Sequence, residues 1–217
     1  MVKLKTRETL NSEVDKQIEY ERYNAMSKSK IGTSQETGIF LKNGSSAIEP
    51  YLQTPYIYYQ GLLSKLIVPK DNVLDLCCGD GIHTFYLGTL AKSVTAVDIA
   101  ENSIELAKEK ANHLNIKNIT FFASDVEELE IGKELFDVIT IVGSLSYLDI
   151  NKLINVINYH LKPKGQLIIL DSYNHNIIYR LNRYIHYLNG QRSYSTLKRM
   201  PNKQTILRFH KEFQNIH

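Results

Sequence analysis

Residues 73–83, with the sequence VLDLCCGDGIH, constrain the fold of this chain more than any other feature. The segment is typical of a buried β-strand that breaks into a tight turn and continues into a helix. Gly79 and Gly81 lie in the turn, where the lack of a Cβ atom allows positive φ angles and the close approach of a ligand. Because the start of a helix directs free N–H groups outward, the segment predicts a binding site at the end of a strand.

A second apolar strand is expected over residues 94–97, and Asp98 follows it directly, seventeen residues after Gly81. An acidic side chain at this position, beside a glycine turn, can bind the hydroxyl groups of a ribose. The two segments together therefore predict a nucleoside-binding site. The alternative for Asp98 is that it only caps the helix that follows.

A dinucleotide-binding fold is the first competitor for this pattern. Its fingerprint has a third glycine, G-x-G-x-x-G, and Thr84 stands at that position here. Asp75, four residues before Gly79, would repel a pyrophosphate but would suit a ligand that carries an ammonium group. The residues therefore favour a zwitterionic nucleoside over a dinucleotide.

The chain alternates continuous apolar segments with helical ones, which predicts an α/β fold with a doubly wound, mostly parallel sheet and helices on both faces. The strands are expected near residues 72–77, 94–98, 118–122, 136–142 and 165–170. Such a sheet binds its ligand at the carboxyl ends of the strands. The residues that fall at these ends are Asp75, Asp98, Asp125, Gly143 and Asp171.

Five segments, in order, resemble the motifs of class I S-adenosylmethionine-dependent methyltransferases, and the resemblance covers roughly residues 50–175. They read VLDLCCGDGIHT, VTAVDIAENSIELAKEKA, ITFFASDVEEL, FDVITIVGSLSYL and LKPKGQLIILDSYN. The resemblance implies a Rossmann-like fold, S-adenosyl-L-methionine as cofactor and S-adenosyl-L-homocysteine as product. In the first motif, the residues it assigns to cofactor binding are Asp75, Cys77, Gly79 and Gly81. Cys77 departs from the family, which most often has glycine there.

The later motifs imply further cofactor contacts. By resemblance, Asp98 would hold both ribose hydroxyls and Ile99 would pack against the adenine. Asp125 would accept a hydrogen bond from the adenine amine, and the Val126 N–H would bond to a ring nitrogen. Gly143 would border the site of methyl transfer. For Asp125, as for Asp98, plain helix capping is the alternative.

Two residues are candidates for the base that would deprotonate a hydroxyl acceptor. His175 follows the fifth predicted strand and Tyr147 follows the fourth. We favour His175 because imidazole titrates near neutral pH, whereas the reference pKa of a tyrosine is near 10. Tyr20 and Tyr23 could close over the site from an N-terminal lid. Transfer from a sulfonium needs no metal, and the adjacent Cys77 and Cys78 lack the partners of a metal site.

We divide the chain into an N-terminal lid over residues 1–50, a cofactor-binding core over residues 51–175 and a tail over residues 176–217. The lid would hold a helix over residues 14–26 and a flexible segment over residues 32–46. The tail is basic and rich in aromatic residues, and we expect it to be helical and to lie on the acceptor side. Family members normally end the sheet with two antiparallel strands, and no pair of strands is evident after Thr205.

The composition agrees with one domain: the chain has 217 residues, of which 43% are hydrophobic, and a net charge of +3. The first residues do not resemble a signal peptide, and no apolar run reaches the roughly 20 residues that span a bilayer. Adjacent cysteines cannot form a structural disulfide. We therefore expect a soluble, cytoplasmic protein with no membrane span.

The acceptor is predicted to be a small molecule or a sugar with a hydroxyl group. The fourth motif lacks the Pro-Pro string of methyltransferases that act on DNA bases or glutamine, and the tail loosely resembles bacterial surface-polysaccharide and sugar methyltransferases. Arg180 and Arg183 could then bind a diphosphate. An RNA-modifying methyltransferase and a non-catalytic cofactor-binding protein remain alternatives. A nucleic-acid partner is disfavoured, and a homodimer is left open.

Overall fold

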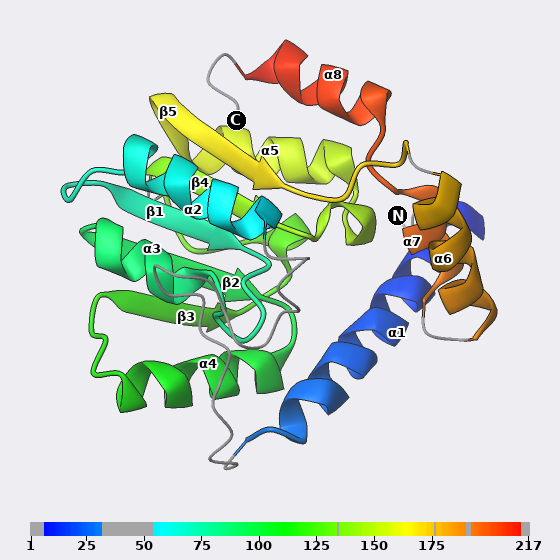
Figure 1. Ribbon diagram of the computed structural model, residues 1–217, viewed down its shortest axis with the longest axis horizontal. Helices are drawn as coiled ribbons and strands as arrows, with labels where there is room; N and C mark the ends of the chain where they lie inside the picture. Colours follow the sequence, from blue (N-terminus) through cyan, green and yellow to red (C-terminus); the bar gives the residue numbers. More distant parts are fainter. Residues whose placement is uncertain (1–6, 32–53, 134, 176, 190–191, 214–217) are drawn as a thin grey trace, which may run out of the picture.

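The computed structural model describes residues 7–31, 54–133, 135–175, 177–189 and 192–213. A central sheet carries helices on both faces, and a further group of helices lies beyond the carboxyl ends of its strands (Figure 1). The flexible segment predicted over residues 32–46 lies outside the described residues.

The sheet contains five parallel strands in the order β3-β2-β1-β4-β5. They are β1 (Asn72–Leu76), β2 (Ser93–Asp98), β3 (Ile119–Ala123), β4 (Phe136–Val142) and β5 (Leu161–Leu170). Each overlaps one of the five segments predicted to be strands. The predicted fold class, a Rossmann-like α/β fold with a doubly wound parallel sheet, is confirmed.

The strands are apolar throughout because both faces of the sheet are covered. Val73 packs with Leu63 and Leu87 on one face, whereas Leu74 packs with Leu153 and neighbouring residues on the other. The first face is covered by α2 (Thr54–Leu66), α3 (Thr84–Leu90) and α4 (Glu101–His113). The second is covered by α5 (Ile150–His160) and α8 (Lys203–Glu212). Each fully buried leucine contributes roughly 1.5–3 kcal/mol, so the sheet forms a rigid base for the site.

Strand β5 begins at Leu161, four residues earlier than predicted. Phe136 of β4 pairs with Leu161 and Val138 with Gln166, so the residues between them leave the ladder. Proline donates no backbone hydrogen bond, and it occurs in sheets mainly at edges and bulges. Pro163 therefore fits the irregular part of β5 at the edge of the sheet.

Three helices gather beyond the carboxyl ends of the strands: α1 (Arg7–Lys28), α6 (Ile177–Leu188) and α7 (Tyr194–Lys198) (Figure 1). Helix α1 contacts α4 and α7, and α6 contacts α7. Helix α1 begins seven residues before the predicted start at residue 14. The division of the chain into lid, core and tail stays a prediction.

Candidate functional site

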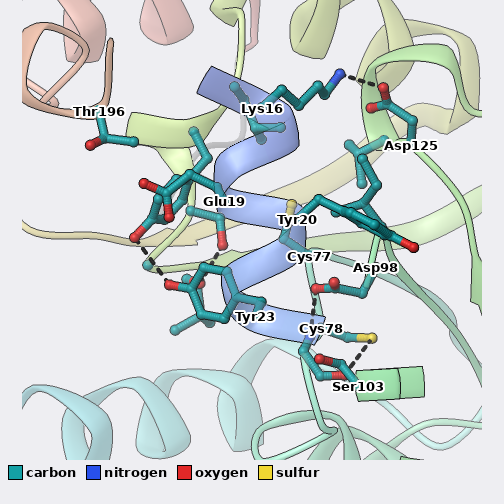
Figure 2. A pocket seen from close by; sticks show the side chains of 18 of the residues that line it. Lys16, Glu19, Tyr20, Tyr23, Cys77, Cys78, Asp98, Ser103, Asp125 and Thr196 are labelled. Atoms are coloured by element: carbon teal, nitrogen blue, oxygen red, sulfur yellow. Dashed lines mark hydrogen bonds and ion pairs between the residues drawn. The ribbon is translucent and has the colours of Figure 1, made fainter. Parts of the chain in front are cut away.

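A cavity of about 300 Å³ lies at the carboxyl edge of the sheet, between the strand ends and α1. Figure 2 shows Lys16, Glu19, Tyr20 and Tyr23 of α1 over this edge. The predicted cofactor-binding residues that line the cavity are Asp75, Cys77, Gly79, Asp98, Ile99, Asp125, Val126 and Gly143. Its volume is at the lower end of the range for small-molecule sites.

The turn after β1 has three residues with left-handed backbone conformations. Cys77 has a φ of 59°, Gly79 of 54° and Gly81 of 83°. A Cβ atom on Gly79 would meet nothing within 4 Å, which leaves space where the turn borders the cavity. A Cβ atom on Gly81 would lie 2.8 Å from the ring of Phe85, and Gly81 is not among the lining residues. Gly79 therefore keeps room for a ligand, and Gly81 allows α3 to pack.

Asp98 joins the ends of β1 and β2. Its Oδ2 atom accepts a hydrogen bond of 2.8 Å from the Gly79 N–H, and its Oδ1 atom accepts one of 2.9 Å from the Ala100 N–H. A carboxylate can accept about four hydrogen bonds, so about two remain for a ligand. Burial raises the pKa of Asp98, an effect that the two backbone donors oppose. Ala100 is the N-cap residue of α4, and no side-chain cap hydrogen bond is found there, so the bond from Ala100 to Asp98 is not the cap that the alternative requires.

Asp75 is buried below the turn. Its carboxylate accepts hydrogen bonds of 2.7 Å from both Thr84 and Thr140. Burial raises the pKa of Asp75 to about 6, although the two hydroxyl donors act in the opposite direction. A cationic ligand group in the adjoining cavity would favour the ionised carboxylate.

Both carboxylate oxygens of Asp125 have partners, one through a hydrogen bond and one through an ion pair. Oδ1 accepts a hydrogen bond of 2.9 Å from the Glu127 N–H and so caps the short helix η2 (Val126–Glu128). Oδ2 pairs with the ammonium group of Lys16, which also lies 3.0 Å from the Glu127 carboxylate. The capping alternative is thus observed, and the adenine contact stays a prediction. Because Lys16 belongs to α1, this ion pair fastens α1 over this part of the cavity.

Two tyrosines, Tyr23 of α1 and Tyr147 of η3 (Leu145–Tyr147), line another part of the cavity. Their hydroxyl oxygens are 3.0 Å apart, and their rings meet edge to face at 5.9 Å. Arg192 donates a hydrogen bond to the Tyr147 hydroxyl, and its guanidinium carbon lies 5.7 Å from the ring centroid. Desolvation and the neighbouring Tyr147 raise the pKa of Tyr23 well above its ordinary value, so Tyr23 remains protonated.

The structure brings Tyr147 to the cavity but not His175. His175 is exposed, its ring stacks on Tyr173 at 5.7 Å, and it is not among the lining residues. Another histidine, His83, does line the cavity, and burial lowers its pKa to about 4. His83 stacks on Tyr56, whose position on α2 gave no sign of this contact in the sequence.

Several lining residues were not identified from the sequence. They come mainly from α1 and the α7 region, and include Asp15, Lys16, Glu19, Ser195, Thr196 and Arg199. One indication of the α7 residues was present in the sequence: the tail was expected to lie on the acceptor side. The partners of individual residues depend on packing between segments more than 100 residues apart.

The parallel sheet, the left-handed turn and Asp98 together define a Rossmann-like protein with a ligand cavity at the strand ends. Residues 73–165 match the family model described as a methyltransferase domain. This part of the chain is therefore similar to the class I S-adenosylmethionine-dependent methyltransferases. The ubiquinone biosynthesis O-methyltransferase of Rickettsia akari is 29% identical over 159 residues, which are 73% of this chain and 60% of that protein.

Two further proteins illustrate the breadth of the similarity. The demethylmenaquinone methyltransferase of Lactococcus lactis is 34% identical over 105 residues, which are 46% of this chain and 42% of that protein. The chain thus spans about half the length of these curated relatives. The solved phosphoethanolamine N-methyltransferase 1 of Haemonchus contortus, in complex with phosphoethanolamine and S-adenosylhomocysteine, is 18% identical with a TM-score of 0.58. That match covers 79% of this chain and 34% of the solved one.

Proposed function

We propose that the protein uses S-adenosyl-L-methionine to methylate a hydroxyl group of a small-molecule acceptor. One observation carries the proposal: the Asp98 carboxylate, held by the N–H groups of Gly79 and Ala100, borders a cavity in which Tyr147 also lies. The proposed ribose-binding acid and a candidate base thus share one cavity.

The residues fit the cofactor. Asp98 retains about two acceptor positions, which match the two hydroxyls of a ribose. Ile99 and the buried Val126 provide apolar surface for an adenine, and Asp75 provides a carboxylate for an ammonium group. When bound, S-adenosylmethionine supplies a methyl group that is already activated by its sulfonium. The solved relative with bound S-adenosylhomocysteine supports the same cofactor here.

The position of Tyr147 supports it, rather than His175, as the base. Arg192 donates a hydrogen bond to the Tyr147 hydroxyl and places a positive charge beside its oxygen. As base, the Tyr147 oxygen would take the proton from the acceptor hydroxyl, and bound S-adenosylmethionine would supply the methyl group and leave as S-adenosylhomocysteine when its sulfur–methyl bond breaks. Tyr23, which remains protonated, can donate a hydrogen bond to the Tyr147 oxygen. The enclosed cavity contributes by holding the reacting groups in line.

A hydroxyl acceptor is consistent with the name of the Rickettsia akari relative, which specifies an O-methyltransferase. A sugar hydroxyl remains within this proposal, as does a phenolic one. Both require a nearby base and neither requires a metal.

Two measurements on the purified protein test the function. Titration calorimetry with S-adenosylmethionine should show binding, and S-adenosylhomocysteine release should depend on one member of a panel of phenols, sugars and amines. Release with a phenol or sugar supports the proposal, and release with amines alone would contradict the hydroxyl acceptor. Binding without turnover across a broad panel would favour the non-catalytic alternative. An absence of cofactor binding would refute the proposal.

A further inference from the structure

Helix α6 presents its apolar side chains to solvent. Ile177 is 79% exposed, Leu181 58% and Leu188 63%, and Tyr184 and Ile185 lie between them on the same side. Their spacing of three and four residues forms one stripe along a helix. We call these five residues the α6 stripe.

Two polar residues on the opposite side of the same helix face inward. Arg183 is only 8% exposed, and His186 is half-buried. A surface helix of a globular protein normally turns its apolar side toward the core, so α6 is inverted relative to that arrangement. A contiguous apolar surface of this kind marks a site that another molecule covers.

The charges around the α6 stripe indicate the kind of molecule. Residues 177–199, which include α6 and α7, contain five arginines and lysines and no aspartate or glutamate. Arg180 lies on α6 itself and is exposed, and Lys198 is exposed on the neighbouring α7. An anionic partner complements this segment, whereas a second copy would bring one basic segment against another.

The α6 stripe lies close to the candidate active site. Tyr187 of α6 and Tyr194 of α7 pack with their rings 5.9 Å apart, and Thr196 of α7 lines the cavity. Figure 1 shows α6 beside α7 at the periphery, away from the sheet. A surface that covers the α6 stripe would therefore lie near the acceptor side of the cavity.

We propose that α6 docks the protein on an anionic lipid bilayer, with the α6 stripe in the boundary between headgroups and acyl chains. Helices that combine an apolar face with cationic residues bind at this boundary, and each nearby cation adds attraction to anionic lipid. A nucleic acid would satisfy the cations but would leave the leucines and isoleucines in water. Within the described ranges no helix has the length and hydrophobicity to cross a bilayer, so the association is peripheral.

Vesicle flotation tests the proposal without cofactor or acceptor, so its outcome is separate from that of the proposed function. The wild-type protein should float with vesicles of equal parts phosphatidylcholine and phosphatidylglycerol, and much less with phosphatidylcholine alone. Higher salt should weaken the binding because it screens the cations. The double substitution Leu181→Ser, Leu188→Ser should lower the partition coefficient at least about tenfold, since it removes two large apolar side chains.

The matched control is Ile57→Ser, which alters an equally exposed residue (54%) on α2 and should leave the partition coefficient unchanged. Circular dichroism should show the same fold for all variants, because each altered side chain is exposed. The proposal is overturned if the wild type does not float with anionic vesicles, or if the double variant floats as well as the wild type.

Two other molecules that could cover the α6 stripe would give different results in binding experiments. A dimer in sedimentation velocity that the double substitution disrupts, in a protein that does not bind vesicles, would identify a second copy and refute the lipid proposal. Salt-sensitive binding of an RNA duplex that the double substitution leaves intact, again without vesicle binding, would assign the cationic segment to nucleic acid.

Discussion

The carboxylate of Asp98 accepts a hydrogen bond of 2.8 Å from the backbone N–H of Gly79, and this contact joins the ends of the two central strands of the site. The substitution Asp98→Ala should weaken S-adenosylmethionine binding by about 2 kcal/mol, or roughly 30-fold in Kd. The reason is that two ribose hydroxyls would lose a charged acceptor. Titration calorimetry at neutral pH measures the change.

Asp137 provides a matched control for Asp98. It also accepts a backbone hydrogen bond, from the Asn72 N–H at 2.9 Å, but it lies near the amino end of β4. Asp137→Ala should therefore leave the cofactor Kd unchanged. If both variants lose affinity equally, the effect of Asp98→Ala reflects general loosening of the sheet rather than a ribose contact.

The two glycines of the turn should respond differently to alanine. Gly81→Ala should lower the free energy of unfolding by about 2–5 kcal/mol, because the new Cβ would clash with Phe85 and the φ of 83° is strained for alanine. Gly79→Ala should cost only about 1–2 kcal/mol, from backbone strain alone, while it weakens cofactor binding at least about tenfold. Urea denaturation and calorimetry separate the two effects. Equal losses of stability would show that Phe85 moves aside without cost.

The buried Asp75 should make stability depend on pH. Its pKa is raised from 3.8 to about 6, so the folded protein keeps this proton to a higher pH than the unfolded chain. The contribution of Asp75 to the free energy of unfolding therefore falls as the pH rises from about 4 to about 6. The total change is roughly 3 kcal/mol, since each pKa unit corresponds to about 1.36 kcal/mol.

The variant Asp75→Asn isolates this contribution. It should be more stable than the wild type at pH 7.5, and the difference should shrink toward pH 4. Urea denaturation of both proteins at several pH values gives the comparison. A difference that does not vary with pH would show that the Asp75 carboxylate does not titrate in this window.

The same carboxylate should make cofactor binding depend on pH. If Asp75 interacts with the ammonium group of S-adenosylmethionine, only its ionised form attracts that group, so affinity should fall as the pH drops through 6. Calorimetry at pH 5.5 and 7.5 should show tighter binding at the higher pH. Asp75→Asn should bind more weakly than the wild type at pH 7.5 and should lose this dependence.

The sheet could be predicted because each of its strands has a recognisable local sequence pattern. Val73, Leu74 and Leu76 form a continuous apolar run, which a strand covered on both faces requires. The start of β5 was missed because Leu161 and Gln166 pair with β4 on either side of an irregular segment. No local pattern distinguishes such a segment from a turn that precedes the strand.

The side of the cavity at the strand ends, where we propose that the cofactor binds, could also be predicted, since its residues follow strands that end at one edge. The other side could not. Lys16 meets Asp125 across 109 positions, and Tyr23 meets Tyr147 across 124. Helix α1 has no clear apolar stripe that would show which side faces the protein. The contact of Arg192 with Tyr147 likewise depends on how α7 packs against η3.

The position of Tyr147 in the cavity leads to a prediction about the base. Tyr147→Phe should lower kcat by about 10² or more, because general base catalysis typically contributes 10²–10⁴ and phenylalanine cannot accept the proton. His175→Ala should leave kcat unchanged, since His175 is exposed and outside the cavity lining. Both substitutions should preserve the cofactor Kd. A large loss of turnover with His175→Ala and none with Tyr147→Phe would restore the histidine as the base.

Arg192 should act through Tyr147. Arg192→Met should lower kcat, because it removes the hydrogen bond that Arg192 donates to the Tyr147 hydroxyl and the positive charge beside that oxygen. Arg192→Lys keeps the charge and should partly restore kcat. In a Tyr147→Phe background, which has no hydroxyl to accept this bond, Arg192→Met should have little further effect on kcat. A purely structural role for Arg192 would instead lower kcat equally in both backgrounds, so the double-mutant comparison decides whether Arg192 acts through Tyr147.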